Sequence, residues 1–118
     1  MNKTWWDEMV PRQRDEVIAL NLMGWQPSVL QNIYAQLRPP GADECTVDMA
    51  PHYTTDRNAC ALVLDEIAKK KLWQTFSMNM QKHLGIPDNG PDIWVAIWCA
   101  NRADPDTICY CAIKAVES

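Results

Sequence analysis

Cysteine and histidine are the residue types in this chain that could bind a metal ion or act as a nucleophile with its base; there are five of the first and two of the second. Cys109 and Cys111 are two positions apart in a predicted helix, so their side chains point about 200° apart around its axis and one ion cannot easily bind both. His52 and His83 have no cysteine or histidine near them at ligand spacing. The spacing therefore predicts no metal site.

A cysteine nucleophile needs a base within hydrogen-bonding reach, and neither histidine lies in a recognisable nucleophile or base motif. The cysteines form an odd set with irregular spacing and no secretion signal, which favours reduced thiols that pack in the interior over a disulfide framework. They are Cys45, Cys60, Cys99, Cys109 and Cys111. We predict no catalytic residue, no cofactor and no enzymatic activity. An enzyme whose Cys/His or Asp/His groups meet only in space is the third functional hypothesis.

A helix start at residues 53–57 carries hydroxyl groups, free backbone amides and a guanidinium, which together could bind an anion such as a phosphate while Tyr53 stacks on a base. Asp56 opposes this interpretation, because a carboxylate there satisfies the amides and repels an anion. Plain capping of the helix is therefore favoured, and the anion pocket is the alternative. The residues of that alternative pocket are Tyr53, Thr54, Thr55, Arg57 and Arg102.

The chain has a high tryptophan content, with six tryptophans in 118 residues. Tryptophan side chains commonly fill the hydrophobic core or anchor an interface with a partner. Three of them fall in predicted regular elements and are interpreted as core or sheet-face residues: Trp73, Trp94 and Trp98. The other three occupy terminal or loop positions and are the candidate partner-binding residues, with packing inside the chain as the alternative: Trp5, Trp6 and Trp25.

Local signals predict helices on both sides of the chain's centre. Pro11 begins a helix that runs to about Met23, with Gly24 able to supply its left-handed C-terminal cap. A short helix is predicted after Ser28, because apolar residues up to Leu37 recur at helical spacing.

The helix predicted most directly runs from about residue 55 to residue 70, after a Thr or Asp cap, with an apolar stripe at helical spacing. A last helix starts at Asp104–Thr107, with its core residues up to Val116. Residues 72–80 alternate apolar and polar side chains and predict a strand, and 93–100, apolar on both faces, predict a covered strand. Turn residues at 85–91 would return the chain antiparallel between them.

Length and charge limit the classes of protein that remain. The 118 residues fit one domain, 1–118, in which 38–53 have loop composition and form a variable insert. A net charge of −4 argues against a protein that binds duplex DNA through a basic surface. No run approaches the roughly 20 apolar residues of a membrane span, and we expect a cytoplasmic protein with no membrane contact. The expected fold class is α+β, with a small antiparallel sheet packed with helices as an αβα sandwich.

The order and spacing of three motifs resemble the phage αβα-sandwich domain, a family of small phage and prophage proteins. The matching segments are Met23–Trp25, Tyr53–Asp56 with the helix at 59–68, and Ala103–Asp104 with the helix that ends at 112–116. The resemblance covers most of the chain outside residues 26–50; the tryptophan-rich strand and the proline-containing insert before Pro51 depart from it. It implies a fold and a phage origin, and it supplies no active site.

Two functional hypotheses follow from the resemblance, the small size and the tryptophan content. In the first, the chain is a non-enzymatic phage accessory protein, active in the host cell cytoplasm, that binds a host defence protein or complex and inhibits an anti-phage system, in the manner of an anti-CRISPR protein. In the second, it binds a small molecule and sequesters a nucleotide immune signal, in a pocket formed by residues 53–57, Arg102 and nearby tryptophans. A homodimer is expected, because a small sheet has edges that must be covered.

Overall fold

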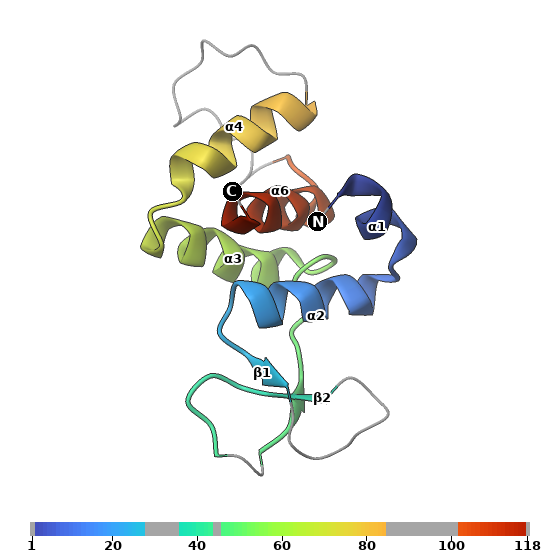
Figure 1. The fold of residues 1–118 in the computed structure, drawn as a ribbon, viewed down its shortest axis with the longest axis vertical. Helices are drawn as coiled ribbons and strands as arrows, with labels where there is room; N and C mark the ends of the chain where they lie inside the picture. The colour runs from blue at the N-terminus through green and yellow to red at the C-terminus, as the bar shows by residue number, and fades with distance from the viewer. Residues whose placement is uncertain (1, 28–35, 44–45, 85–101, 118) are drawn as a thin grey trace.

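Five helices and a three-stranded antiparallel sheet make up the residues that the computed structural model describes, which are 2–27, 36–43, 46–84 and 102–117 (Figure 1). The helices are α1 (Lys3–Glu8), α2 (Pro11–Asn21), α3 (Arg57–Lys69), α4 (Trp73–Leu84) and α6 (Pro105–Glu117). The strands are β1 (Gln26–Pro27), β2 (Gln36–Arg38) and β3 (Asp48–Met49). The predicted α+β class, with helices and a small antiparallel sheet, is confirmed.

The three described strands all lie outside residues 72–80, where a strand was predicted. They are ordered β1-β2-β3 in the sheet, and Leu37 of β2 lies opposite both Pro27 and Asp48. Leu37 was expected to end a short helix, but its buried side chain belongs to this sheet, which lies beyond α2 at one end of the molecule (Figure 1). The strands are only two or three residues long, and Pro27 has no N–H to extend the ladder.

Residues 72–80 are not a strand, because α4 spans Trp73–Leu84. Phe76 and Met80 are buried four residues apart, as one face of a helix requires, whereas Met78 is 58% exposed. On a strand, Met78 would share the face of Phe76 and Met80. The predicted turn at 85–91 and the predicted strand at 93–100 lie outside the described residues, as do Trp94 and Trp98.

The helix boundaries follow their local signals closely. Pro11 is the first residue of α2, and Gly24, just beyond its end, has φ +80°, which a residue with a Cβ adopts only with strain. Asp56 caps α3 by accepting a hydrogen bond from the backbone N–H of Asn58 at 2.9 Å. Asp104 Oδ1 accepts one from the N–H of Asp106 at 3.4 Å as α6 begins. The predicted helices at 11–23, 55–70 and 104–116 are confirmed within a few residues.

Helix α6 is the centre of the core and packs against α2, α3 and α4 (Figure 1). Its buried side chains are small or medium-sized, which lets the three neighbouring helices approach it: Ile108, Cys109, Cys111, Ala112, Ile113 and Ala115. Ile18 of α2, Val63 and Ile67 of α3, and Phe76 of α4 belong to the same buried cluster. Among the described residues, no helix is long and apolar enough to cross a membrane.

Candidate functional site

The helix start at residues 53–57 is a structural joint in which the anion-binding groups are already engaged. The side chains of Tyr53 and Thr54 are buried. Asp15 of α2, itself wholly buried, accepts hydrogen bonds from both the backbone N–H of Thr54, at 2.8 Å, and its hydroxyl, at 2.7 Å. Tyr53 offers no open face to a base, and Thr54 offers no spare donor. Capping and packing account for these two residues of the predicted anion pocket.

The remaining residues of that predicted pocket are exposed but do not meet in one basic site. Arg57 donates a hydrogen bond from Nη2 to the backbone oxygen of Ala103 at 3.0 Å, which ties α3 to the start of α6. Thr55 lines a hollow of 350 Å³ that includes Arg14 and the carboxylates of Asp104 and Asp106. Two carboxylates in the wall oppose an anion there. Arg102 is exposed and does not line this hollow.

The three candidate partner-binding tryptophans separate into one exposed and two buried side chains. Trp5 is 62% exposed on α1, whereas Trp6 is wholly buried and Trp25 is 9% exposed. Trp6 and Trp25 therefore follow the alternative of packing inside the chain, and Trp5 alone presents its ring on the surface. Sequence position could not separate Trp5 from Trp6, because neighbouring helix residues differ in burial according to what the helix packs against.

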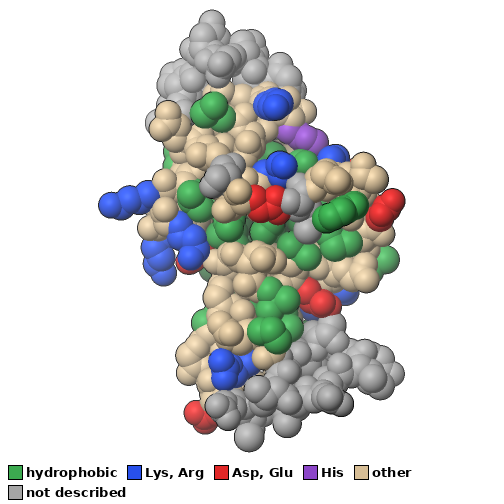
Figure 2. Space-filling view, viewed as in Figure 1, with side chains coloured by type: hydrophobic (Ala, Val, Ile, Leu, Met, Phe, Trp, Pro, Cys, Tyr) green, Lys and Arg blue, Asp and Glu red, His purple; other side chains and the backbone are tan. Residues whose placement is uncertain are grey.

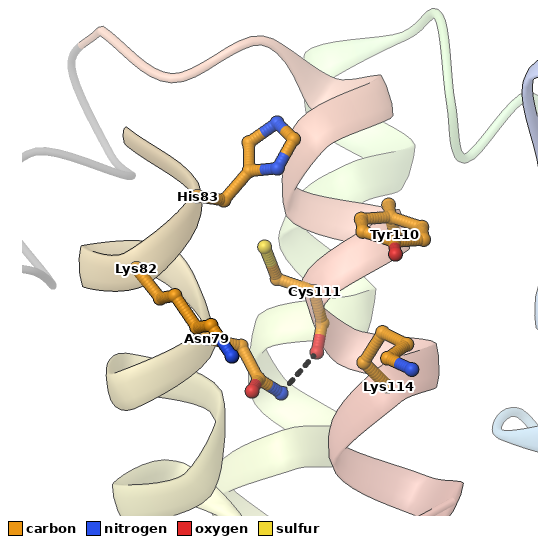
Figure 3. Close-up of a pocket in the computed structure, with 6 residues that line it drawn as sticks. All are labelled: Asn79, Lys82, His83, Tyr110, Cys111 and Lys114. Atoms are coloured by element: carbon orange, nitrogen blue, oxygen red, sulfur yellow. Dashed lines mark hydrogen bonds between the residues drawn. The ribbon is translucent and has the colours of Figure 1, made fainter. Parts of the chain in front are cut away.

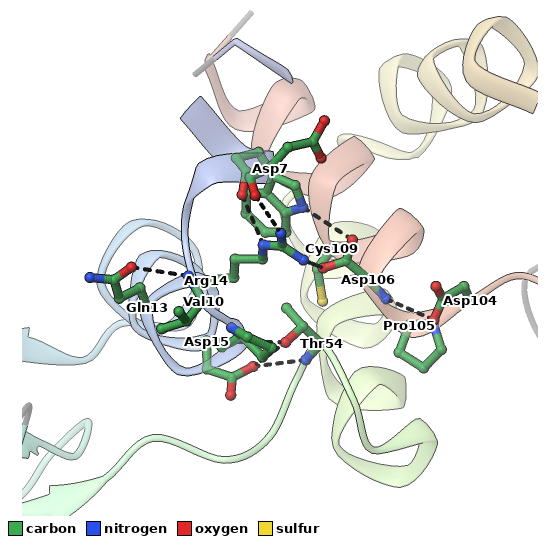
Figure 4. A network of polar contacts seen from close by, with 12 residues as sticks. Asp7, Val10, Gln13, Arg14, Asp15, Thr54, Asp104, Pro105, Asp106 and Cys109 are labelled. Carbon is green, nitrogen blue, oxygen red and sulfur yellow. Dashed lines mark hydrogen bonds and ion pairs between the residues drawn. The ribbon is translucent and has the colours of Figure 1, made fainter. Parts of the chain in front are cut away.

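A polar network centred on Arg14 and Asp106 (Figure 4) supplies the hydrogen-bond partner of the buried Trp6. Its indole Nε1–H donates to Asp106 Oδ2 at 3.3 Å, and Asp106 Oδ1 pairs with Arg14 Nη1 at 2.9 Å. Arg14 also donates to the backbone oxygens of Trp6, at 2.8 Å, and Asp7, at 3.1 Å, in the last turn of α1, where the Trp6 oxygen accepts a second hydrogen bond from the N–H of Met9. Arg14 is thus fully engaged in joining α1, α2 and α6, and this network is structural.

A second hollow, of 460 Å³, lies between α4 and α6 and has a different character. It is lined by Asn79, Lys82, His83, Tyr110, Cys111 and Lys114. Figure 3 shows His83 and Cys111 in the space between the two helices, with Lys82 and Asn79 on the α4 side and Tyr110 and Lys114 on the α6 side. We call these six residues the α4–α6 pocket.

Helical spacing places the lining residues of each helix on one face. Asn79, Lys82 and His83 are at i, i+3 and i+4 on α4, and Tyr110 and Lys114 are four apart on α6. The Asn79 side-chain amide donates to the backbone oxygen of Cys111 at 3.2 Å, which joins the two walls at the floor of the pocket. The rings of His83 and Tyr110 also touch across it, with centroids 5.8 Å apart.

The α4–α6 pocket has a positive lining in a chain that is negative overall. Two of its six lining residues are lysines, a third is a histidine, and none of the six is a carboxylate. Figure 2 shows basic side chains on several sides of the histidine over α4 and α6. Lys82 and His83 lie in the last turn of α4, where positive charge also opposes the helix dipole. This lining can donate hydrogen bonds to an anion, with Tyr110 as a neutral donor.

The buried Cys109 thiol lacks the properties of a nucleophile. Burial, followed by a hydrogen bond with the Cys60 thiol, raises the pKa of Cys109 well above its ordinary value of 9.0. The Cys109 thiol donates to the backbone oxygen of Tyr53 at 3.3 Å and stays protonated near neutral pH. Desolvation likewise raises the pKa of the Tyr53 hydroxyl. Within the described part of the chain, no group of three or more His, Cys, Asp or Glu residues could hold a metal ion.

Comparison with known proteins identifies no family for this chain. No protein-family model matches the chain, and neither a curated protein nor a solved structure does. The resemblance to the phage αβα-sandwich family therefore stays a prediction.

The sequence contained a signal for the α4–α6 pocket that the strand prediction hid. Asn79, Lys82 and His83 share a face only if residues 73–84 are helical. The predicted strand ended at residue 80, so Lys82 and His83 were assigned to neither the strand nor the predicted turn at 85–91.

Proposed function

We propose that this chain is a non-enzymatic binding protein whose ligand is a small phosphate-bearing anion held in the α4–α6 pocket. The observation that carries the proposal is the lining itself: Lys82, His83 and Lys114 face one hollow, and none of the described residues that line it is a carboxylate. The proposal keeps the predicted alternative of nucleotide sequestration and moves its site from the start of α3 to the space between α4 and α6.

The size and exposure of the pocket support a small ligand. Its 460 Å³ falls within the range of about 300–1,000 Å³ that is typical of ligand pockets. Lys82 and His83 are exposed and Tyr110 is half-buried, so an anion can enter and leave without rearrangement of the core. Hydrogen bonds to charged groups each contribute about 1.5–3 kcal/mol, so the two lysines together contribute about 3–6 kcal/mol, which corresponds to a dissociation constant near the millimolar range.

A thermal-shift titration tests the proposal, with inorganic phosphate, pyrophosphate, adenosine monophosphate and a cyclic dinucleotide as probes. Wild-type protein should gain about 2.7 kcal/mol of stability at a ligand concentration 100 times the dissociation constant. The double variant Lys82→Gln/Lys114→Gln should lose the shift. The matched control, Lys69→Gln/Lys70→Gln, removes two exposed lysines of the α3 C-terminus, which pair with Glu66 of the same helix, and should keep it. Sodium chloride of equal ionic strength corrects for general screening.

The absence of any shift with wild-type protein would refute the proposal. Equal loss of the shift in the pocket variant and in the control would also refute it, because the effect would then depend on net charge and not on the pocket.

The second candidate function is the binding of a host defence protein, and the exposed ring of Trp5 is the observation that favours it. Figure 2 shows hydrophobic side chains at the surface over α1, and exposed tryptophan is a common interface anchor. Capture from host lysate on immobilised wild-type protein and on Trp5→Ala tests this function. A defence protein retained by the wild type and lost by Trp5→Ala supports it; retention of the same proteins by both would count against Trp5 as the anchor. The phage accessory role, the cytoplasmic location and the homodimer belong to this candidate.

A further inference from the structure

Helix α1 lies against the wall of the α4–α6 pocket. Lys3 Nζ lies over the ring of Tyr110, 4.7 Å from its centroid, and Tyr110 lines the pocket. Trp6, three residues further along α1, packs on the same ring with a centroid distance of 5.7 Å. Lys3 and Trp6 therefore share the face of α1 that contacts α6. The buried Trp6 holds this face in place, so the position of Lys3 beside the pocket follows from the packing of α1.

The interactions that now hold Lys3 are weak enough to be exchanged. Lys3 Nζ pairs with Asp7 Oδ1 at 3.0 Å, but the two side chains are 41% and 57% exposed. Exposed ion pairs within one helix contribute little, and they are screened by salt. A phosphoryl group on the ligand is a stronger acceptor for the ammonium than a solvated carboxylate. The long lysine side chain can turn from Asp7 towards the pocket while α1 stays in place.

We propose that Lys3 is a third lysine of the pocket, and that the pocket accordingly binds a ligand with two adjacent phosphoryl groups. This inference rests on the proposed function. Lys82 belongs to α4 and Lys114 to α6, and both line the pocket, while Lys3 of α1 lies over the ring of the lining residue Tyr110, so three elements bring lysines to or beside the pocket. A single phosphate engages only part of such a set, whereas a diphosphate carries enough charge and length to engage groups on more than one element.

Isothermal titration calorimetry with inorganic pyrophosphate tests this, on the wild type and on Lys3→Gln, Asp7→Asn, Lys82→Gln and Lys69→Gln. Lys3→Gln should weaken pyrophosphate binding about tenfold and orthophosphate binding much less. Asp7→Asn should tighten pyrophosphate binding about threefold, because it releases Lys3 from its ion pair. Lys69→Gln should bind like the wild type. Urea midpoints should be equal for Lys3→Gln and wild type, which separates a binding role from a structural one.

The failure of this inference differs from the failure of the proposed function. If wild-type protein binds pyrophosphate and Lys82→Gln weakens it, but Lys3→Gln binds as Lys69→Gln does, the role of Lys3 is refuted and the pocket stands. If wild-type protein binds neither pyrophosphate nor orthophosphate, the pocket itself is refuted.

Discussion

Trp6 carries an unusual share of the contacts that hold the N-terminal part of the chain. Its ring is wholly buried, tilts against Tyr110 and lies 5.7 Å from the Arg14 guanidinium, and its indole N–H reaches Asp106. Its neighbour Trp5 makes none of these contacts and is 62% exposed. The two adjacent tryptophans therefore differ in burial, in ring contacts and in hydrogen bonding, so they should contribute very differently to stability.

At the residue scale, we predict that Trp6→Ala lowers the free energy of unfolding by about 3–5 kcal/mol, as for other large buried side chains. Trp5→Ala should change it by less than about 0.5 kcal/mol, because its ring faces solvent. Urea unfolding followed by circular dichroism measures both. Comparable losses in the two variants would mean that α1 is not docked through Trp6.

The tryptophans also show that the burial of a side chain cannot be predicted from the residues next to it in the sequence. The burial of Trp6 depends on Asp106, which is 100 residues away in the chain. No local pattern contains that information, whereas the cap at Asp56 needs only the next two residues. Hydrogen bonds between residues that are close in the sequence were predictable, whereas hydrogen bonds between residues that are distant in the sequence were not.

At the element scale, α4 was predicted as a strand because the spacing of its apolar residues fits a strand as well as a helix. Apolar residues at i, i+4 and i+8, here Leu72, Phe76 and Met80, are all even steps apart, so they fit one face of a strand as well as one face of a helix. Met78 completed an apparent alternation, yet it is exposed. The three confirmed helices were less ambiguous, because their apolar residues include odd steps such as Cys60 to Val63 and Cys109 to Ala112.

This difference gives a direct test of α4. We predict that Met80→Ala lowers the free energy of unfolding by about 2–5 kcal/mol, because the Met80 side chain is wholly buried. Met78→Ala should be within about 0.5 kcal/mol of wild type. Chemical denaturation of the two variants measures this contrast. Equal effects would favour the alternating strand, on which both methionines occupy the same face.

The α4–α6 pocket could not be recovered from the sequence for the same reason. Its two walls come from helices whose pairing depends on burial of Phe76, Met80 and the inner face of α6. Once α4 was assigned as a strand, Lys82 and His83 fell near a predicted turn and carried no signal. The fold class survived this error, since short strands elsewhere, at 26–27, 36–38 and 48–49, supply the sheet.

At the scale of the whole molecule, the buried thiol and phenol groups set the response to alkaline pH. The raised pKa of Cys109 means that the folded protein keeps this proton above pH 9, where the unfolded chain releases it. The unfolded state then binds fewer protons, so stability falls as pH rises. Below the ordinary value of 9.0 both states are protonated, and Cys109 contributes no pH dependence there.

We therefore predict that the free energy of unfolding falls between pH 9 and pH 10, with up to about 1.4 kcal/mol per pH unit due to Cys109. Cys109→Ala should show a shallower fall, and the remainder should include the raised pKa of Tyr53. Urea titrations at several pH values measure both slopes. An identical pH dependence for the two proteins would contradict the assignment to Cys109.

The joint between α1 and α6 also bears on the order in which the chain acquires structure. Six residues are too few for an isolated helix to be stable in water, so α1 depends on Asp106 and Tyr110 for its existence. Those residues are made about a hundred positions later. Helix α1 can therefore become stable only after α6 has been made, and until then the ring of Trp6 has neither the tyrosine nor the carboxylate that it packs against in the folded chain.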